Sequence, residues 1–296
     1  MTQFFSRRLL LRMAILLLAI AAGFLITENW SGHSADAAST EIQLASHKAI
    51  YSYKMKSLQS GARISGIAGE MYYEQDDVCD AWTTDHRFSS TYYYPEQKAV
   101  ENASHFIAWE AKDGSGMQFN SERDEDGKTV EQLRGAVELR AEGGFLARYI
   151  RPSDLTFDLK PDTYFPSKHT QELLRRALKG ESFFNAIVFD GTDSEGPIEI
   201  NSFIGKSATA EEIATIKKAL PKEADPQLLT PRAWHVRMAA FSDLDKEEKT
   251  PVYTMDMILH DNGVISQVFI DYGEFSIEQV LKTVQLLKPR NCSEKN

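Results

Sequence analysis

Residues 66–94 read GIAGEMYYEQDDVCDAWTTDHRFSSTYYY and predict a β-hairpin that carries one of the two cysteines of the chain. The runs 67–73 and 82–94 are rich in the aromatic and β-branched side chains typical of strands. The Glu-Gln-Asp-Asp cluster between them favours a turn. The second cysteine, Cys292, lies close to the C-terminus. If Cys79 bonds Cys292, the end of the chain is tied to this early hairpin, and nearly the whole mature sequence becomes one closed loop.

The first 37 residues have the three parts of a secretory signal peptide. A basic start with three arginines precedes an apolar run at 13–26 and an Ala-Asp-Ala pattern that ends the segment. We therefore expect a periplasmic protein whose mature chain starts near Ala38, with residues 38–45 as a flexible N-terminal segment. Two alternatives stay open. One is an uncleaved anchor, although the apolar run is short for a span of about 20 residues. The other is export by the twin-arginine route, which the paired arginines resemble.

Composition favours a folded acidic domain. Hydrophobic residues make up 42% of the chain and charged residues 26%, and the remaining length of about 260 residues suits one large β domain or two small ones. The formal net charge of -10 argues against nucleic acid or an anionic membrane as the main partner. Two cysteines in an exported chain favour one structural disulfide over a metal site or a redox motif.

Beyond the hairpin, apolar and polar residues alternate with period two, in runs separated by Gly, Asp or Asn about every dozen residues. Pairs such as Asp113-Gly114 and Asn262-Gly263 are typical hairpin turns. The pattern predicts an antiparallel meander that forms a strongly curved sheet. The predicted strands are 47–58, 99–110, 116–123, 129–142, 145–150, 183–189, 198–204, 232–241, 252–260 and 264–272.

Two segments have helical spacing instead. Residues 166–180 end at a glycine, and residues 209–220 begin with a threonine cap and end before a proline. A third segment, 276–287, fits either a helix or a last strand, and its period does not decide between them. Because no low-complexity linker separates two halves, we predict a single domain over 46–293. The apolar face of the first helix consists of Leu173, Leu174, Ala177 and Leu178.

Several short motifs follow one another in a distinctive order. They are HKAIYSY at 47–53, Ser65-Gly66-Ile67-x-Gly69, CDAWTT at 79–84, Phe165-Pro166-x-x-His169, Val188-Phe189-Asp190-Gly191, Asp271-Tyr272-Gly273-Glu274-Phe275 and a final Pro-x-x-Cys292. Together they resemble the cell envelope integrity protein EipB family of α-proteobacteria, over roughly residues 45–293.

The resemblance implies a mainly β fold, an antiparallel β-spiral of two overlapping curved, half-barrel-like sheets. One or two helices are expected, one of them packed against the concave face; we expect this helix to be 166–180. The resemblance also implies a disulfide between Cys79 and Cys292 and a strand at 276–287. For function it implies support of envelope integrity through interactions with other envelope proteins, with no catalytic residues.

Motifs for chemistry are weak. The six histidines that follow the signal segment show neither HExxH nor a Cys/His zinc spacing, and the chain has no G-x-S-x-G elbow. We interpret His169 as a packing or hydrogen-bonding residue. Asp190 and Asp193 could form a hydrolase carboxylate pair, but an Asp-Gly turn explains them without function. We therefore expect no enzyme, no cofactor and no metal site.

Two classes of function stay open. The leading one is a non-enzymatic periplasmic protein that supports envelope integrity by binding other envelope proteins. An enzyme such as a cell-wall hydrolase ranks third, after the alternative that follows. The alternative is a carrier or sensor of a lipid or lipoprotein acyl chain, held in a cavity of a few hundred Å³ between sheet and helix. Aromatic side chains of neighbouring strands between Tyr72 and Tyr94 face both sides of the sheet, so some form core and others can line a groove or a patch for a partner.

Overall fold

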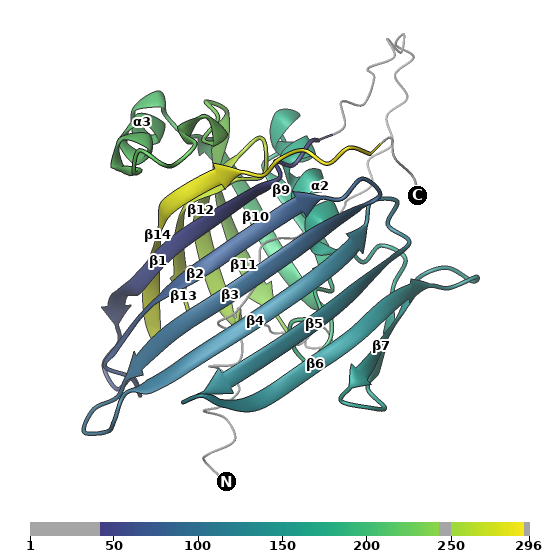
Figure 1. The fold of residues 1–296 in the computed structure, drawn as a ribbon, viewed down its shortest axis with the longest axis horizontal. Coiled ribbons are helices and arrows are strands. Elements are labelled where there is room, and N and C mark those ends of the chain that lie inside the picture. Colours follow the sequence, from purple (N-terminus) through teal and green to yellow (C-terminus); the bar gives the residue numbers. More distant parts are fainter. Residues whose placement is uncertain (1–41, 243–249, 293–296) are drawn as a thin grey trace.

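The computed structural model describes residues 42–242 and 250–292. The expected signal peptide at 1–37 and residues 38–41 of the expected N-terminal segment lie outside the described residues. Within the described part the chain forms fourteen strands, helices α2 (Pro166–Leu178) and α3 (Ala210–Ala219), and a short 3-10 helix η1 (Pro226–Leu228) (Figure 1). The strands are β1 His47–Leu58, β2 Gly66–Asp77, β3 Ala81–Tyr93, β4 Val100–Ala111, β5 Gly116–Glu125, β6 Lys128–Leu139, β7 Phe145–Arg151, β8 Thr156–Leu159, β9 Phe183–Val188, β10 Ile198–Ser207, β11 Ala233–Phe241, β12 Tyr253–His260, β13 Ile265–Asp271 and β14 Phe275–Leu286.

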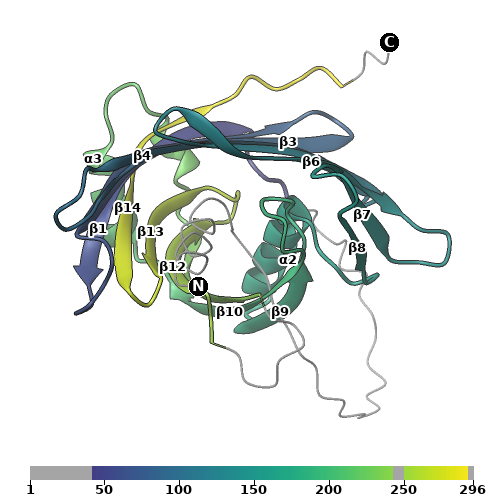
Figure 2. The same cartoon turned by 90° about the horizontal axis from the view of Figure 1, so that it is seen from below.

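All these strands belong to one antiparallel sheet with the order β8-β7-β6-β5-β4-β3-β2-β1-β14-β13-β12-β11-β10-β9. The first and last strands pair in its middle, and two meanders run outward from them to the edges β8 and β9. The sheet curls until the β9–β13 half lies under the β1–β7 half, with α2 enclosed beside β9 (Figure 2). The predicted mainly β, strongly curved fold is confirmed, and its two overlapping layers are halves of one continuous hydrogen-bonded sheet.

The hairpin at 66–94 forms, but its turn comes later than the sequence suggested. Strand β2 continues through the polar cluster to Asp77, and residues 78–80 make the turn, with Cys79 at a φ of 78°. The prediction of a turn in the cluster was wrong because its polar side chains have tertiary partners. Gln75 donates to the Ser167 hydroxyl at 3.4 Å, and Asp76 accepts from Arg290 at 2.8 Å.

Alternate residues of each strand face the inside of the curl and form two adjoining apolar clusters. The larger cluster joins β1–β3, α2 and β9–β14, and the smaller joins β4–β8 with Phe165 and Phe189. Close packing requires Gly69 in β2, because a Cβ there would lie 2.7 Å from the ring of Tyr53 and 2.2 Å from the carbonyl oxygen of Ser89. This glycine belongs to the motif Ser65-Gly66-Ile67-x-Gly69.

Helix α2 lies inside the curl as expected, with one change in its apolar face. Leu173 and Leu174 are fully buried and Ala177 is nearly so, whereas Leu178 is 41% exposed at the helix end. The expectation that Leu178 points inward was therefore wrong. The helix ends at Leu178, so this residue lies where the chain already turns toward Gly180.

The two ends of the domain also have defined places. Segment 276–287 is strand, because β14 fills the gap between β1 and β13. Residues 42–45, which we expected to be flexible, lie against the core: Ile42 and Leu44 are buried, and Gln171 of α2 donates to the Ile42 carbonyl at 2.8 Å. Among the described helices, none has the length and apolar character needed to cross a bilayer.

Candidate functional site

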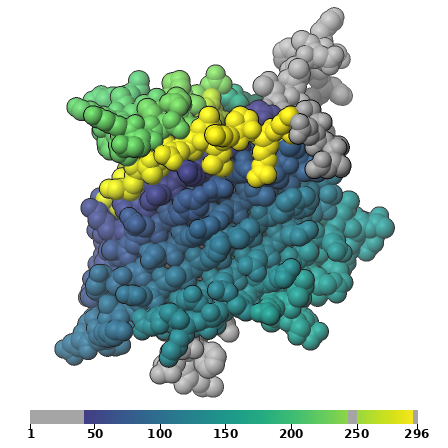
Figure 3. Space-filling view, viewed as in Figure 1, coloured from purple at the N-terminus to yellow at the C-terminus, as the bar shows by residue number. Residues whose placement is uncertain are grey.

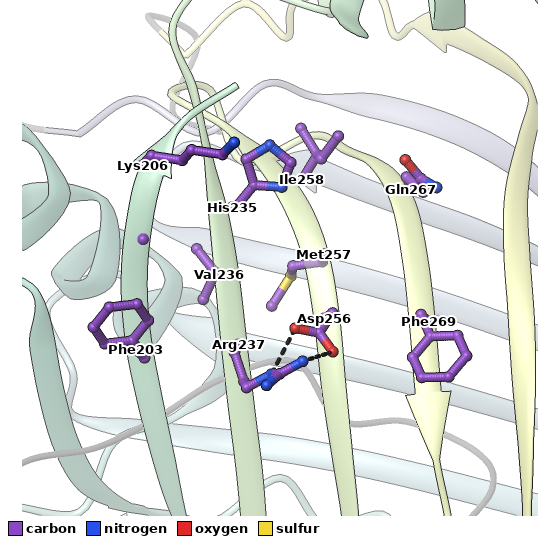
Figure 4. Close-up of a pocket in the computed structure, with 11 residues that line it drawn as sticks. Phe203, Lys206, His235, Val236, Arg237, Asp256, Met257, Ile258, Gln267 and Phe269 are labelled. Atoms are coloured by element: carbon purple, nitrogen blue, oxygen red, sulfur yellow. Dashed lines mark hydrogen bonds and ion pairs between the residues drawn. The ribbon is translucent and has the colours of Figure 1, made fainter. Parts of the chain in front are cut away.

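The outer face of β10–β13, turned away from α2, holds a groove of about 520 Å³ (Figure 4). One cross-strand row forms its floor, because Phe203 pairs with Arg237, Arg237 with Asp256, and Asp256 with Phe269. A second row pairs His235, Ile258 and Gln267 in the same way. In these two rows each strand contributes one or two side chains, and the register of strand pairing brings them together.

A charged pair lies between two aromatic rings in the first row. The Arg237 guanidinium donates from Nε and Nη2 to the two carboxylate oxygens of Asp256 at 2.7 and 2.8 Å. These hydrogen bonds raise the pKa of Arg237. Because both side chains face solvent, the pair contributes about 0–1 kcal/mol to stability. Phe203 is 54% exposed, so its ring is accessible to a partner.

Helix α3 supplies a charge at the other end of the groove. Its first turn is a capping box in which Thr209 and Glu212 bond each other's backbone N–H. These hydrogen bonds lower the pKa of Glu212 to about 2, so the carboxylate is ionised at neutral pH. Glu212 lies 3.2 Å from Nε2 of His235 in the second row. The groove therefore combines two aromatic rings and the Arg237–Asp256 pair in one row with His235, beside Glu212, in the other.

A second, much smaller space lies inside the curl, between the start of α2 and strands β2–β4. It measures about 50 Å³. Glu110 of β4 projects into this region and accepts the backbone N–H groups of Ser167 and Lys168 at 2.8 and 2.9 Å. The N-cap residue Phe165 has no capping side chain, so a carboxylate from the sheet caps α2 instead. Burial raises the pKa of Glu110, and the two backbone hydrogen bonds counter that shift.

Two further ionisable groups line the same internal space. The His86 ring is buried 4.5 Å from the ring of Tyr73, and burial lowers its pKa to about 3. Asp190 accepts from the backbone N–H and the hydroxyl of Thr192, both at 2.8 Å, while burial raises its pKa to about 7. The structure thus places Asp190 inside the protein. Beside it, a Cβ on Gly191 would meet the Phe119 ring at 2.4 Å.

His169 is a packing residue of the core. Its ring stacks on Phe184 with centroids 4.9 Å apart and planes at 11°, and it meets Tyr164 edge-on. Neither ring nitrogen has a hydrogen-bond partner among the described residues. Burial holds the pKa of His169 well below its usual value, so the ring is neutral. In the described part of the chain, no group of three or more His, Cys, Asp or Glu side chains could hold a metal ion.

The structure joins Cys79 and Cys292 in a disulfide across a sequence separation of 213 residues. The last described segment crosses the ends of β1–β3 to reach it, and appears in yellow in the space-filling view (Figure 3). Beside the bond, Lys112 contacts Asp77 at 2.5 Å and lies 4.5 Å above the ring of the buried Trp82. At this corner the disulfide ties the exposed C-terminal segment to the β2–β3 turn.

Sequence reasoning missed the outer groove. Its residues are two or three positions on each of four strands, and none belongs to a motif. The one local signal is the aromatic residue at an outward position, Phe203 in β10 and Phe269 in β13. Among the residues between Tyr72 and Tyr94, Trp82 and Tyr92 are core, while Tyr93 is 47% exposed.

Comparison with known proteins gives consistent matches. The family model described as EipB-like matches residues 38–288. A curated relative, the cell envelope integrity protein EipB of Brucella abortus, is 28% identical over 263 residues, which cover 88% of this chain and 91% of the relative. A solved structure from Brucella abortus, titled as a β-barrel-like protein of a domain of unknown function, superposes with a TM-score of 0.75 at 26% identity. That match covers 83% of this chain and all of the solved one.

Proposed function

The chain belongs to the EipB-like family, and on that basis we propose that it supports cell envelope integrity by binding other envelope proteins rather than by catalysis. The observation that carries the proposal is the match to a cell envelope integrity protein over most of both chains. The outer groove is our candidate for the binding surface, because it combines the exposed ring of Phe203 and the half-buried ring of Phe269 with a charged pair. Aromatic residues and arginine are the residue types enriched where proteins bind each other.

The expected location fits this role. A periplasmic protein with an acidic surface meets partners by diffusion in the space between the two membranes, and its net charge favours neutral or basic partner surfaces. We propose that residues 1–37 are removed on export. Recovery of periplasmic protein whose N-terminus is near Ala38 tests this step, and a protein that retains Met1 in the membrane fraction would contradict it.

The internal space beside the start of α2 does not suit an acyl chain. Such a carrier needs a cavity of a few hundred Å³. The described space between the start of α2 and strands β2–β4 measures about 50 Å³, and polar groups such as Glu110 and Asp190 line it. Apolar chains do not enter small polar cavities, because the polar groups would lose their hydrogen bonds.

The test is complementation of a deletion strain of the source organism under detergent stress. A double variant, Phe203→Ser with Phe269→Ser, removes both rings of the groove and leaves the inner face unchanged. We expect it to accumulate to wild-type levels and to fail to restore growth. The matched control is Trp109→Ser, which removes a ring that is 37% exposed on the outer face of β4, away from the groove.

Two results would count against the proposal. Full rescue by the double variant would show that the groove is not the binding surface. A deletion strain with unchanged resistance to detergent and to cell-wall-degrading enzymes would reject the envelope role itself.

A further inference from the structure

The two edges of the sheet differ in how they are protected. Strand β8 has four residues and the sequence TFDL, and its central Asp158 forms an ion pair with Arg140. Strand β9 has six residues, FFNAIV, and carries no charge. Short length and charge are the usual ways in which proteins protect a sheet edge against pairing. Edge β9 lacks both.

The backbone of β9 shows which groups face this open edge. Tyr164 donates to the carbonyl of Ile187 at 2.9 Å, and Phe189 donates to the carbonyl of Tyr164 at 3.0 Å. A strand directs the N–H and C=O of one residue to the same side and those of the next residue to the other side. Phe183 and Asn185 must therefore direct their backbone groups outward, as Ile187 does. Of the described residues, only Tyr164 forms a bridge at this edge, beside Val188.

Side chains form two walls beside the edge. On the outer side, Phe183 and Phe203 pair across β9 and β10 and are 52% and 54% exposed, so the edge continues into the outer groove. On the inner side, α2 covers β9: Arg176 lies 4.4 Å above the ring of Phe184 and bonds Glu172 at 2.7 Å. An added strand would thus meet aromatic rings with one set of its side chains and charged groups of α2 with the other.

We propose that β9 is a docking edge at which an extended segment of a partner protein adds as a further strand, beside Phe183–Ile187. This inference rests on the proposed function and names the way in which the partner binds. Backbone hydrogen bonds to Phe183 and Asn185 hold the segment, and apolar side chains on its outer side pack on the Phe183–Phe203 pair. Tyr164 already uses this edge in the same way, through two backbone hydrogen bonds at its far end.

Charge decides between the possible occupants. Each copy of the chain has a formal net charge of -10, and the loop after β9, residues 189–197, has two acids outside the core, Asp193 and Glu195, and no lysine or arginine. A second copy would bring a like-charged edge and its own Tyr164 against the first. A segment with basic residues is attracted instead. The occupant is therefore an extended segment of another protein, apolar on alternate positions and basic at the end that lies near the loop.

The test uses the folded domain with its disulfide and a synthetic peptide of about eight residues that alternates valine and threonine and ends in two lysines. The control peptide has proline at its centre, which cannot pair as a strand. Binding is measured by fluorescence anisotropy, and hydrogen exchange then locates the protected amides. We expect protection at Phe183, Asn185 and Ile187 with the first peptide and no binding of the second.

Matched proline variants test both edges of the sheet. Asn185→Pro removes one outward N–H from β9, and Thr156→Pro removes one from β8, where Leu155 bonds inward to Tyr149 and Thr156 faces outward. We expect about tenfold weaker binding for the β9 variant and no change for the β8 variant. If Asn185→Pro does not fold, Phe183→Ser serves instead, since it leaves the backbone intact and removes the ring on which the apolar side chains of the peptide pack.

The results of these experiments distinguish a failure of the docking edge from a failure of the proposed function. Failure of the peptide to bind, protection at other strands, or equal loss from both proline variants would overturn the docking edge. Suppose that Asn185→Pro rescues the deletion strain and the double variant Phe203→Ser with Phe269→Ser does not. The docking edge is then rejected, while the proposed role in protein interaction stands. Loss of rescue by Asn185→Pro at normal protein abundance supports both the docking edge and the proposed function.

Discussion

At the scale of single residues, the interior is organised by a few buried polar groups with distinct tasks. Glu110 joins the sheet to α2 by accepting two helix N–H groups. His86 and Asp190 line the same small cavity, and burial shifts their pKa values in opposite directions because it favours the neutral form of both a base and an acid. These groups make the stability of the protein depend on pH in ways that can be assigned to single side chains.

Replacing Glu110 should loosen the start of α2. Glu110→Gln keeps the size of the side chain but removes the negative charge that faces the helix N-terminus, and one backbone N–H loses its acceptor. We expect the free energy of unfolding, measured in urea, to fall by about 1–3 kcal/mol. The control Glu101→Gln changes an exposed glutamate of the same strand and should have almost no effect. Equal values for the two variants would mean that Glu110 is not the cap of α2.

Asp190 should make the protein less stable as pH rises. Because burial raises the pKa of Asp190 to about 7, the folded state holds this proton more tightly than the unfolded state, where aspartate titrates near about 4. The contribution of Asp190 to the free energy of unfolding therefore declines between about pH 4 and about pH 7 and is constant above that range. His86 has the opposite effect between about pH 3 and about pH 6.5, since burial lowers its pKa.

Comparison of wild type with Asp190→Asn isolates this effect from that of His86. We expect the variant to gain stability relative to wild type by about 2–4 kcal/mol from pH 4 to pH 7, in urea unfolding at a series of pH values. Asp113→Asn is the contrasting control, because a hydrogen bond from Ser115 lowers the pKa of the exposed Asp113. A difference between wild type and Asp190→Asn that does not change with pH would show that folding does not raise the pKa of Asp190.

At the scale of elements, α2 was predicted well because its helical spacing, its proline start and its glycine stop are all local. One pair of variants tests its packing. Leu174→Ala should lower the free energy of unfolding by about 2–5 kcal/mol, since Leu174 is fully buried between α2 and the sheet. Leu178→Ala, on the same helix but 41% exposed, should cost less than about 1 kcal/mol. Similar losses from both would contradict the orientation of the helix.

The elements that sequence could not decide depend on partners far away in the chain. In β14, Ile277 and Leu281 fit a helical stripe as well as a strand, and only pairing with β1 and β13 makes the segment a strand. In β2, polar residues resembled a turn because their partners, Ser167 and Arg290, are remote. The outer groove has the same origin: Arg237 and Asp256 are unremarkable in sequence and meet through register.

At the scale of the whole molecule, the first and last strands pair in the middle of the sheet. Strand β1 pairs with β14, and beyond β14 the chain crosses the strand ends to reach Cys79. The disulfide therefore closes a loop of 213 residues that contains most of the fold. Both halves of the spiral depend on the central β1–β14 pair, so a loss of order at the C-terminus should spread to the whole domain.

Removing the disulfide should lower global stability without removing a chemical activity. In the chain-entropy model, closing a loop of this length stabilises the folded state by roughly 5 kcal/mol. We expect Cys292→Ser to lose several kcal/mol in thermal or urea unfolding, and the double variant with Cys79→Ser to match it, because either change opens the same loop. Rescue of the deletion strain should decline only in proportion to the amount of folded protein.

Two free thiols in the native exported protein would contradict the disulfide. A variant with normal stability and abundance but no rescue would indicate a thiol-dependent role instead.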